Sequence, residues 1–523
     1  MKTTKLDRGR RLALAGMGAI PLSPLLSRFA FAADAAALNS LRRVALVVGN
    51  GAYRDPDDVL KNAVNDAVAM AAQLEAMGFA VTRLVDAKKT VFNEAIEQFS
   101  RGIEKAVGLF YFAGHGFQLG WRNYLVPVDA RFVTDADVRE QAVDLETLMR
   151  GLKRAGNPMN IVILDACRDN PFLADLKSGK GLSQMDAPAG TILAYATAPG
   201  NGAADVGNRE KNGLYTGHLL SEMRVRDAKI EDVFKRVRLN VRRESGGAQV
   251  PWESTSLEED FYLYPPAQLK KASEAELDRE YAQQLAAWSQ LEPTEAAIAA
   301  YLRRYPSGHF SELAQIRLDA VLARSGEKKI AIVDSKANPF TAGTVRSRLD
   351  YQVGDEYMYR TIDLYTNVAR PGPRLTVSAV NEGEVTFANG FVSDLLGNSV
   401  RMANGRRVVD NQPYPVEYAL GKKWVTRFQV EEGGTVVDEM QLEFKVVARE
   451  TITVPAGTFD TFRVAGTGWA RGGRKREVTH WMAPDRVRRF IAREQFRSPS
   501  PTMGVNARGD KHRIELVKFS EKA

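Results

Sequence analysis

Short runs of apolar residues alternate with amphipathic stretches over the first half of the chain. The apolar runs have the length of strands buried on both faces, and they fall at residues 44–48, 80–84, 109–113, 161–164 and 192–196. Apolar residues at helical spacing separate them, at residues 64–74, 145–152 and 230–241. Thr90 is the predicted N-cap of the helix after the second run. From residue 43 to residue 264 this order predicts an α/β fold, a mostly parallel sheet covered by helices on both faces.

The pattern changes after Pro265 and Pro266. Residues 270–325 carry amphipathic helices, one of which begins after Pro293-Thr294 and ends at Pro306. From residue 332 to residue 523, apolar and polar residues alternate in short stretches separated by glycine-containing turns, which is the pattern of a β-rich domain. A chain of 523 residues is also too long for one hydrophobic core, so several domains are expected.

The only cysteine of the chain, Cys167, follows the apolar run 161–164. A residue at the carboxyl end of a parallel strand lies where open α/β sheets place their sites. Because side chains alternate along a strand, Asp165 and Cys167 are expected to project to the same side and to share one crevice.

Another strand of the predicted sheet, residues 109–113, leads into Gly114-His115-Gly116. The glycines let the backbone turn sharply, so His115 is expected at the strand's end with an uncrowded imidazole. A cysteine nucleophile needs such a neighbour, because an unperturbed thiol is mostly protonated at neutral pH. His115 and Cys167 are therefore the predicted catalytic pair. For Cys167 the alternative is a small buried hydrophobe, the usual role of a lone cysteine.

Together these stretches resemble the caspase-like cysteine peptidases, the group of caspases and metacaspases, and their bacterial members in particular. Asp165-Ala166-Cys167-Arg168 and residues 111–116 stand in the order and spacing of the caspase signature. Further matching stretches bring the resemblance to residues 41–265, and they lie at residues 44–50, 62–67, 123–129, 195–200 and 249–253. The architecture that the resemblance implies is the caspase fold.

The resemblance implies a cysteine endopeptidase. Cys167 would attack the peptide carbonyl, His115 would exchange protons with the thiol and the leaving amine, and the backbone N–H groups of Gly116 and Cys167 would form the oxyanion hole. No third side chain is assigned to orient the histidine. Asp165 stands where caspases have a glutamine; a carboxylate there, as in metacaspases, favours cleavage after Arg or Lys. Asp205 falls near a second acidic pocket position of metacaspases, with a turn-forming aspartate as the alternative.

The segment after Cys167 contains Lys177 and Lys180 in a glycine-containing stretch. In caspases the equivalent linker is cut during activation, and both lysines would suit a pocket that prefers basic side chains. They are the candidate autoprocessing sites, and an ordinary solvated loop is the alternative.

Residues 1–33 have the layout of an export signal. Basic residues, among them Arg10 and Arg11, precede a mostly apolar stretch at residues 12–26 and the small-residue pattern Ala30-Phe31-Ala32. The arginine pair favours the twin-arginine route, and an uncleaved anchor is the alternative. The mature protein is expected in the periplasm, where a single cysteine forms no internal disulfide.

Two resemblances concern the second half of the chain. Residues 301–308 resemble a helical-repeat hairpin of the tetratricopeptide type, and residues 453–463 with 481–484 resemble β-clam domains of bacterial envelope proteins. The alternative function is therefore a non-proteolytic caspase-like scaffold whose C-terminal β domain binds an envelope ligand or protein. The presence of both Cys167 and His115 favours the peptidase.

The composition limits the classes of binding partner that are expected. The formal net charge of +8 arises from 72 basic and 64 acidic residues spread along the chain, and no groove motif combines aromatic with basic residues. Nucleic acid is therefore not an expected partner, and peptide or protein substrates are. We find no metal-ligand spacing and predict no cofactor. Metacaspases are often calcium-dependent, but the acidic residues here form no recognisable calcium loop.

Overall fold

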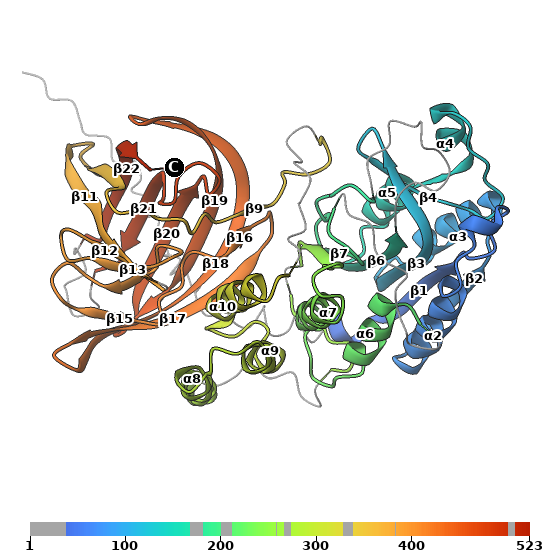
Figure 1. Ribbon diagram of the computed structural model, residues 1–523, viewed down its shortest axis with the longest axis horizontal. Helices are drawn as coiled ribbons and strands as arrows, with labels where there is room; N and C mark the ends of the chain where they lie inside the picture. The colour runs from blue at the N-terminus through green and yellow to red at the C-terminus, as the bar shows by residue number, and fades with distance from the viewer. Residues whose placement is uncertain are drawn as a thin grey trace, which may run out of the picture.

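The computed structural model describes residues 38–167, 181–199, 212–257, 259–265, 274–327, 338–381, 383–499 and 508–522, and it gives only the backbone at Cys167, Glu274 and Leu277. An N-terminal α/β lobe and a C-terminal β lobe lie on either side of a short helical segment (Figure 1). The predicted signal at residues 1–33 lies outside the described residues. Among the helices of the described part, none is long and apolar enough to cross a membrane.

The α/β lobe is built on one sheet with the strand order β2-β1-β3-β6-β7-β8. Strands β2, β1, β3, β6 and β7 run parallel to one another and β8 runs antiparallel to β7. In chain order its elements are β1 Arg42–Gly49, η1 Pro56–Asp58, α2 Ala63–Ala76, β2 Phe79–Val85, α3 Lys89–Gly102, β3 Ala106–Leu119, β4 Arg122–Leu125, α4 Asp135–Gln141, β5 Val143–Asp144, α5 Leu145–Ala155, β6 Met159–Cys167, β7 Thr191–Tyr195, α6 Leu214–Met223, α7 Ile230–Glu244 and β8 Trp252–Thr255.

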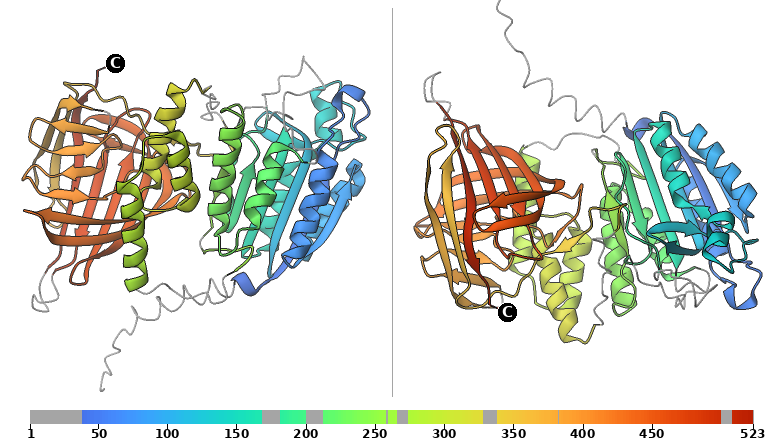
Figure 2. Two further views of the ribbon diagram at one scale, coloured as in Figure 1. Left: turned by 60° about the horizontal axis from the view of Figure 1, so that its bottom comes forward. Right: turned by 90° about the horizontal axis from the view of Figure 1, so that it is seen from above.

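Helices cover both faces of this sheet, as Figure 2 shows, which confirms the predicted architecture. Helices α2, α6 and α7 pack on one face, where alternate strand residues such as Tyr111 and Ile163 join their core. Helices α3 and α5 pack on the other face, against the intervening residues such as Phe110 and Phe112. The central strands β1, β3, β6 and β7 lack a polar face over most of their length because both of their sides are covered, which explains their continuous apolar runs.

Two local predictions for this lobe are wrong. Strand β3 does not end at Ala113 but continues through His115 to Leu119, because its outer half pairs with β4 in an antiparallel hairpin. Helix α3 begins at Lys89 with Lys88 as its N-cap, so Thr90 lies inside the helix instead of capping it. The N–H of Lys89 bonds instead to the Asp129 carboxylate, at 3.0 Å, which supplies the cap from a distant loop.

The helical segment comprises α8 Glu274–Ser289, α9 Glu295–Arg304 and α10 Ser311–Arg324. Thr294 caps α9 by accepting a hydrogen bond from Ala297 N at 3.2 Å, as the sequence predicts. On one side, Arg242 of α7 binds both carboxylate oxygens of Glu327, at 2.7 and 2.6 Å. On the other, Glu312 of α10 accepts from Val416 N at 2.8 Å and pairs with Lys422 at 3.0 Å. The segment therefore contacts both lobes through charged groups.

The C-terminal lobe is β-rich, as predicted, and closes into a barrel of the strands β10 to β15 and β17 to β22. Its elements are β9 Val345–Arg346, β10 Glu356–Asp363, β11 Ala369–Val380, β12 Glu384–Phe387, β13 Val392–Asp394, β14 Ser399–Arg401, β15 Arg407–Val409, β16 Glu417–Tyr418, β17 Lys423–Glu432, β18 Thr435–Val454, β19 Gly457–Ala470, β20 Arg474–Met482, β21 Ala492–Arg497 and β22 Asp510–Ser520. Strand β22 pairs with β10, which joins the end of the lobe to its beginning.

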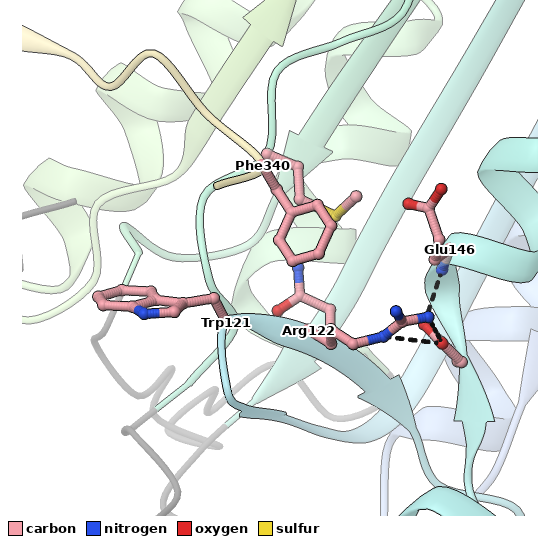
Figure 3. Close-up of a pocket in the computed structure, with 7 residues that line it drawn as sticks. Trp121, Arg122, Glu146 and Phe340 are labelled. Atoms are coloured by element: carbon pink, nitrogen blue, oxygen red, sulfur yellow. Dashed lines mark hydrogen bonds and ion pairs between the residues drawn. The ribbon is translucent and has the colours of Figure 1, made fainter. Parts of the chain in front are cut away.

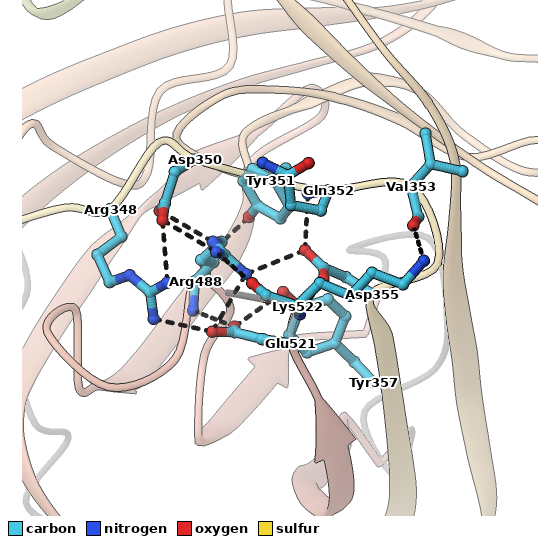
Figure 4. A network of polar contacts seen from close by, with 10 residues as sticks. All are labelled: Arg348, Asp350, Tyr351, Gln352, Val353, Asp355, Tyr357, Arg488, Glu521 and Lys522. Atoms are coloured by element: carbon cyan, nitrogen blue, oxygen red, sulfur yellow. Dashed lines mark hydrogen bonds and ion pairs between the residues drawn. The ribbon is translucent and has the colours of Figure 1, made fainter.

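A buried ion cluster lies where the barrel closes (Figure 4). The Arg488 side chain has no exposed surface and lies 3.0 Å from carboxylate oxygens of Asp350 and Asp355 and 3.3 Å from Glu521. Tyr357 donates a hydrogen bond to Glu521 at 2.9 Å. Because Glu521 lies just after β22 and Asp350 precedes β10, this cluster links the first and the last segments of the β lobe. Removal of one charge would leave the opposite charge buried without a partner, and this costs more free energy than the ion pair itself contributes to stability.

Candidate active site

Strands β3 and β6 bring the two predicted catalytic residues together. The strands pair in parallel from Val107↔Met159 onward, and the last pair of the ladder is His115↔Cys167. Cys167 is the final residue of β6. Its backbone thus lies directly opposite that of His115, although the two residues are far apart in the sequence.

The glycines beside His115 permit close packing and do not form a turn, contrary to the sequence-based expectation. A Cβ atom on Gly114 would lie 2.7 Å from Phe112 Cζ and 2.8 Å from the hydroxyl of Tyr53. A Cβ atom on Gly116 would lie 2.9 Å from Ala166 Cβ. Contacts this short are repulsive, so both positions accept only glycine without rearrangement.

The imidazole of His115 is enclosed, not uncrowded, with 4% of the residue exposed. Its Nε2 lies 2.7 Å from the backbone carbonyl oxygen of Asp58. A carbonyl can only accept, so Nε2 carries the proton and Nδ1 is the basic nitrogen of the neutral ring. The sequence identified no side chain to orient the histidine, and here a backbone carbonyl performs that task. A backbone group leaves no residue-type signal in the sequence.

Tyr53 also contacts His115, through a hydrogen bond and through its ring. Its hydroxyl accepts a hydrogen bond from His115 N at 2.9 Å and donates to Val126 O at 3.3 Å. Its ring centroid lies 4.6 Å from that of the imidazole. Burial raises the pKa of Tyr53, so the hydroxyl keeps its proton. Sequence reasoning missed this residue, because only the fold places the segment between β1 and α2 beside β3.

Asp165 lies two residues before Cys167 and contacts α6. Thr216 donates a hydrogen bond from Oγ1 to Asp165 Oδ2 at 2.6 Å, and the Tyr111 hydroxyl lies 2.6 Å from the same Thr216 oxygen. Burial, followed by the charges of Asp165 and Asp66, raises the pKa of Tyr111 well above its ordinary value. A polar cluster of Asp165, Tyr111 and Thr216 therefore lies on the face of the sheet that α2, α6 and α7 cover; together with Asp66 it is called the acidic cluster.

Asp66 is an acidic residue of this cluster that sequence reasoning missed. It is 3% exposed and accepts hydrogen bonds from Gly213 N at 3.0 Å and Asn212 Nδ2 at 2.8 Å. The matching stretch at residues 62–67 contained it, but a polar residue on a helix looks solvated until its neighbours are known. The negative charges of Asp66 and Asp165 both contribute to the raised pKa of Tyr111.

Other predicted site residues fall outside the described part of the chain. These are Asp205, Lys177 and Lys180, together with the side chain of Cys167. The second acidic pocket position and the autoprocessing sites stay predictions, as do the backbone oxyanion donors at Gly116 and Cys167. Within the described residues no three His, Cys, Asp or Glu side chains converge to hold a metal ion.

A small pocket lies at the tip of the β3–β4 hairpin (Figure 3). It is lined by Trp121, Arg122, Asn123, Asp144, Glu146, Met185 and Phe340. Phe340 follows the helical segment and packs against the core on the α3 and α5 face, opposite the face that carries Tyr111. Nearby, Asp186 accepts hydrogen bonds from Thr341 Oγ1 and Ala342 N, both at 2.7 Å. The pocket is thus a junction between chain segments and is separate from the acidic cluster.

Comparison with known proteins supports this description of residues 42–262, which match the family model described as "Caspase domain". The human (Homo sapiens) mucosa-associated lymphoid tissue lymphoma translocation protein 1 is 27% identical over 191 residues, 36% of this chain and 22% of that protein. Its Mus musculus homolog is 26% identical over 191 residues, with the same coverage. The matched region spans less than a quarter of these relatives' length.

Two solved structures are similar to this chain at low sequence identity. The Drosophila initiator caspase Dronc is 15% identical, with a TM-score of 0.34, and the match covers 43% of this chain and 85% of that one. Caspase-1 from Spodoptera frugiperda is 17% identical, with a TM-score of 0.34, and the match covers 44% of this chain and 95% of that one.

Proposed function

Residues 42–262 of this chain are a caspase domain, and from this premise we propose that the protein is a cysteine endopeptidase that cuts peptide bonds after Arg or Lys. The observation that carries the proposal is the strand register that sets His115 opposite Cys167, with the imidazole oriented by the Asp58 carbonyl. A buried hydrophobic cysteine would need neither an oriented histidine nor its supporting hydrogen bonds.

In the proposed reaction the Cys167 thiol gives its proton to Nδ1 of His115 and its sulfur adds to the peptide carbonyl carbon. Backbone N–H groups at Gly116 and Cys167 bind the oxygen that becomes negative. The carbon–nitrogen bond then breaks, and the leaving amine takes the proton from the imidazolium. Water attacks the resulting thioester with His115 as the base, which releases the carboxylic acid and restores the thiol. No metal or cofactor enters this sequence.

The proposed preference for a basic side chain rests on Asp165 and Asp66. The first turn of α6 donates to both carboxylates, from Gly213 N to Asp66 of α2 and from Thr216 Oγ1 to Asp165 of β6, so the two acidic side chains lie close to the carboxyl end of β6. A substrate guanidinium or ammonium that leaves water needs an opposite charge to compensate its lost hydration. An acidic side chain would instead be repelled.

The test uses matched fluorogenic peptides that end in Arg, Lys or Asp, assayed with the mature protein and with Cys167→Ala. We expect hydrolysis of the Arg and Lys peptides, and a loss of about 10⁴-fold or more in the variant. Parallel assays with calcium and with a chelator test whether calcium activates the protein. Cleavage only after Asp would contradict the proposed preference for Arg or Lys but would still support Cys167 as the nucleophile. Equal hydrolysis by Cys167→Ala would remove the peptidase proposal itself.

Two further parts of the proposal concern maturation. We propose export to the periplasm by the signal at residues 1–33, where the C-terminal β lobe would bind an envelope component. We also propose autoprocessing after Lys177 or Lys180. Mass spectrometry of the active protein beside Cys167→Ala tests the second point, and a fully active protein with an intact segment would contradict it.

A further inference from the structure

The first turn of α6 contacts both carboxylates of the acidic cluster, the buried Asp66 and the partly buried Asp165. Gly213 is the N-cap of this helix, and its N–H lies 3.0 Å from Asp66 Oδ1. Thr216 stands in the same turn and donates to Asp165 Oδ2 at 2.6 Å. A negative side chain at a helix N-terminus is favourable, because the unpaired N–H groups there are donors. One turn of helix therefore places two carboxylates that come from different elements.

The hydrogen bonds around Thr216 have a fixed direction. Asp165 as a carboxylate can only accept, so the single hydroxyl proton of Thr216 is directed to it. The Tyr111 hydroxyl, 2.6 Å from the same oxygen, then donates to Thr216. Both Tyr111 and Thr216 have no exposed surface, so water does not compete for the hydrogen bond between them, whereas Asp165 is partly exposed.

An aspartate needs such a contact to hold one orientation. Rotation about its χ2 angle is broad, so the carboxylate plane is not set by the residue itself. Threonine is branched at Cβ and stiff at χ1, so its hydroxyl is a firm anchor. The plane matters most when the partner is a guanidinium, which binds a carboxylate through two parallel hydrogen bonds, whereas an ammonium acts as a point charge.

We propose that Thr216 is a positioning residue for substrate specificity, whose hydroxyl orients the Asp165 carboxylate toward an arginine side chain. This inference rests on the proposed preference for basic residues. It goes beyond it, because it assigns the difference between Arg and Lys substrates to a residue of α6 that does not itself contact the substrate.

The experiment compares three peptides that differ only at the residue before the cut: Arg, Lys and citrulline, the neutral isostere of Arg. Thr216→Val keeps the shape of the side chain and removes the donor. We expect kcat/KM for the Arg peptide to fall about tenfold, mostly through KM, because one charge-assisted hydrogen bond is lost. The Lys peptide should lose about threefold or less by the same argument. Citrulline hydrolysis should stay unchanged, and Thr216→Ser should restore most of the Arg activity.

Thr191→Val is the matched control for removal of a buried threonine hydroxyl. Thr191 also has no exposed surface, and its hydroxyl accepts from Asn160 Nδ2 at 3.4 Å in the sheet. This variant should lower the melting temperature and leave the ratio of Arg to citrulline hydrolysis unchanged. A merely structural role for Thr216 predicts the same behaviour for Thr216→Val, which would overturn the inference.

Binding separates this inference from the proposed hydrolysis. Calorimetry with acetyl-arginine amide on Cys167→Ala should show binding that weakens about tenfold in the Cys167→Ala, Thr216→Val double variant. If the wild-type protein cuts none of the peptides but this binding difference is present, the inference stands and the proposed hydrolysis fails. If Arg peptides are cut with unchanged ratios in Thr216→Val, the inference alone fails. Absence of arginine binding overturns the inference whatever the hydrolysis.

Discussion

Two regions of the molecule hold buried or partly buried carboxylates in different ways. In the α/β lobe, Asp66 and Asp165 accept hydrogen bonds from a backbone N–H, a side-chain amide and a hydroxyl. In the β lobe, Asp355 and Glu521 lie against the guanidinium of Arg488. A neutral donor orients a carboxylate without neutralising it, whereas a guanidinium does both. The first arrangement is compatible with the proposed recognition of a basic substrate, and the second is compatible with closure of the β lobe.

The largest expected effect breaks the cluster of the β lobe. Arg488→Met leaves Asp355 and Glu521 buried without their cation, so the free energy of unfolding should fall by about 3–5 kcal/mol. Denaturant titration measures this, and peptide hydrolysis per folded molecule should not change. Arg486→Met is the control, because this neighbouring arginine is exposed. Equal unfolding free energies for the two variants would show that the cluster does not hold the lobe closed.

Removal of charge in the acidic cluster should affect recognition instead of stability. Asp66→Asn keeps an oxygen that accepts from Gly213 N and removes the negative charge. We expect kcat/KM for Arg peptides to fall about 100-fold and citrulline peptides to be unaffected, since loss of one partner of a buried charged contact costs about 2–5 kcal/mol. Glu75→Gln, on the exposed side of the same helix, controls for net charge. An equal fall in kcat/KM for all peptides would mean that Asp66 does not take part in recognition of the basic side chain.

A smaller effect should separate catalysis from specificity. Tyr53→Phe keeps the ring beside the imidazole and removes the acceptor of His115 N. We expect kcat to fall about tenfold, because a buried hydrogen bond that positions the base is lost. The ratio of Arg to citrulline hydrolysis should stay constant, in contrast to Asp66→Asn. Tyr301→Phe is the control, since its buried hydroxyl has no partner among the described residues. A changed ratio would place Tyr53 in substrate recognition.

The smallest effect concerns a carboxylate held by a hydroxyl outside the acidic cluster. Asp410 accepts a hydrogen bond from the Tyr281 hydroxyl of α8, and burial raises the pKa of Asp410 to about 7. The unfolded value is about 3.9. The stability that comes from protonated Asp410 is therefore fully present below about pH 4 and is lost as the pH rises through about 7.

Asp410→Asn should remove this pH dependence. The amide stays neutral and its oxygen can accept from Tyr281. Because Asp410 is partly exposed and solvent screens its charge, the melting temperature above pH 7 should rise by only about 2–4 °C, equivalent to about 1 kcal/mol. At pH 4 the variant and the wild-type protein should melt alike. Glu384→Gln, an exposed acid on β12, is the control. A lower melting temperature above pH 7 would mean that ionised Asp410 stabilises the contact with α8.

Much of the fold follows from local pattern. The apolar runs became strands β1, β2, β3, β6 and β7, and the residues at helical spacing in α5 are the ones that it buries. The short elements β4, β5 and β8 were missed, because two to four residues carry too little periodicity to be recognised. The helix start at Thr90 was wrong, because Asp129 caps α3 from outside the helix.

The sequence by itself determined which residues are candidates for the proposed chemistry: one cysteine at the end of a buried strand, one histidine between glycines, and an aspartate two residues before the cysteine. These are properties of neighbouring residues. Only the tertiary structure decided how these groups are held. It extended β3 past His115, brought the Asp58 carbonyl and Tyr53 to the imidazole, and placed Asp66 and Thr216 in one cluster with Asp165. Those contacts depend on strand order and helix packing, and they join segments that share no local pattern along the chain.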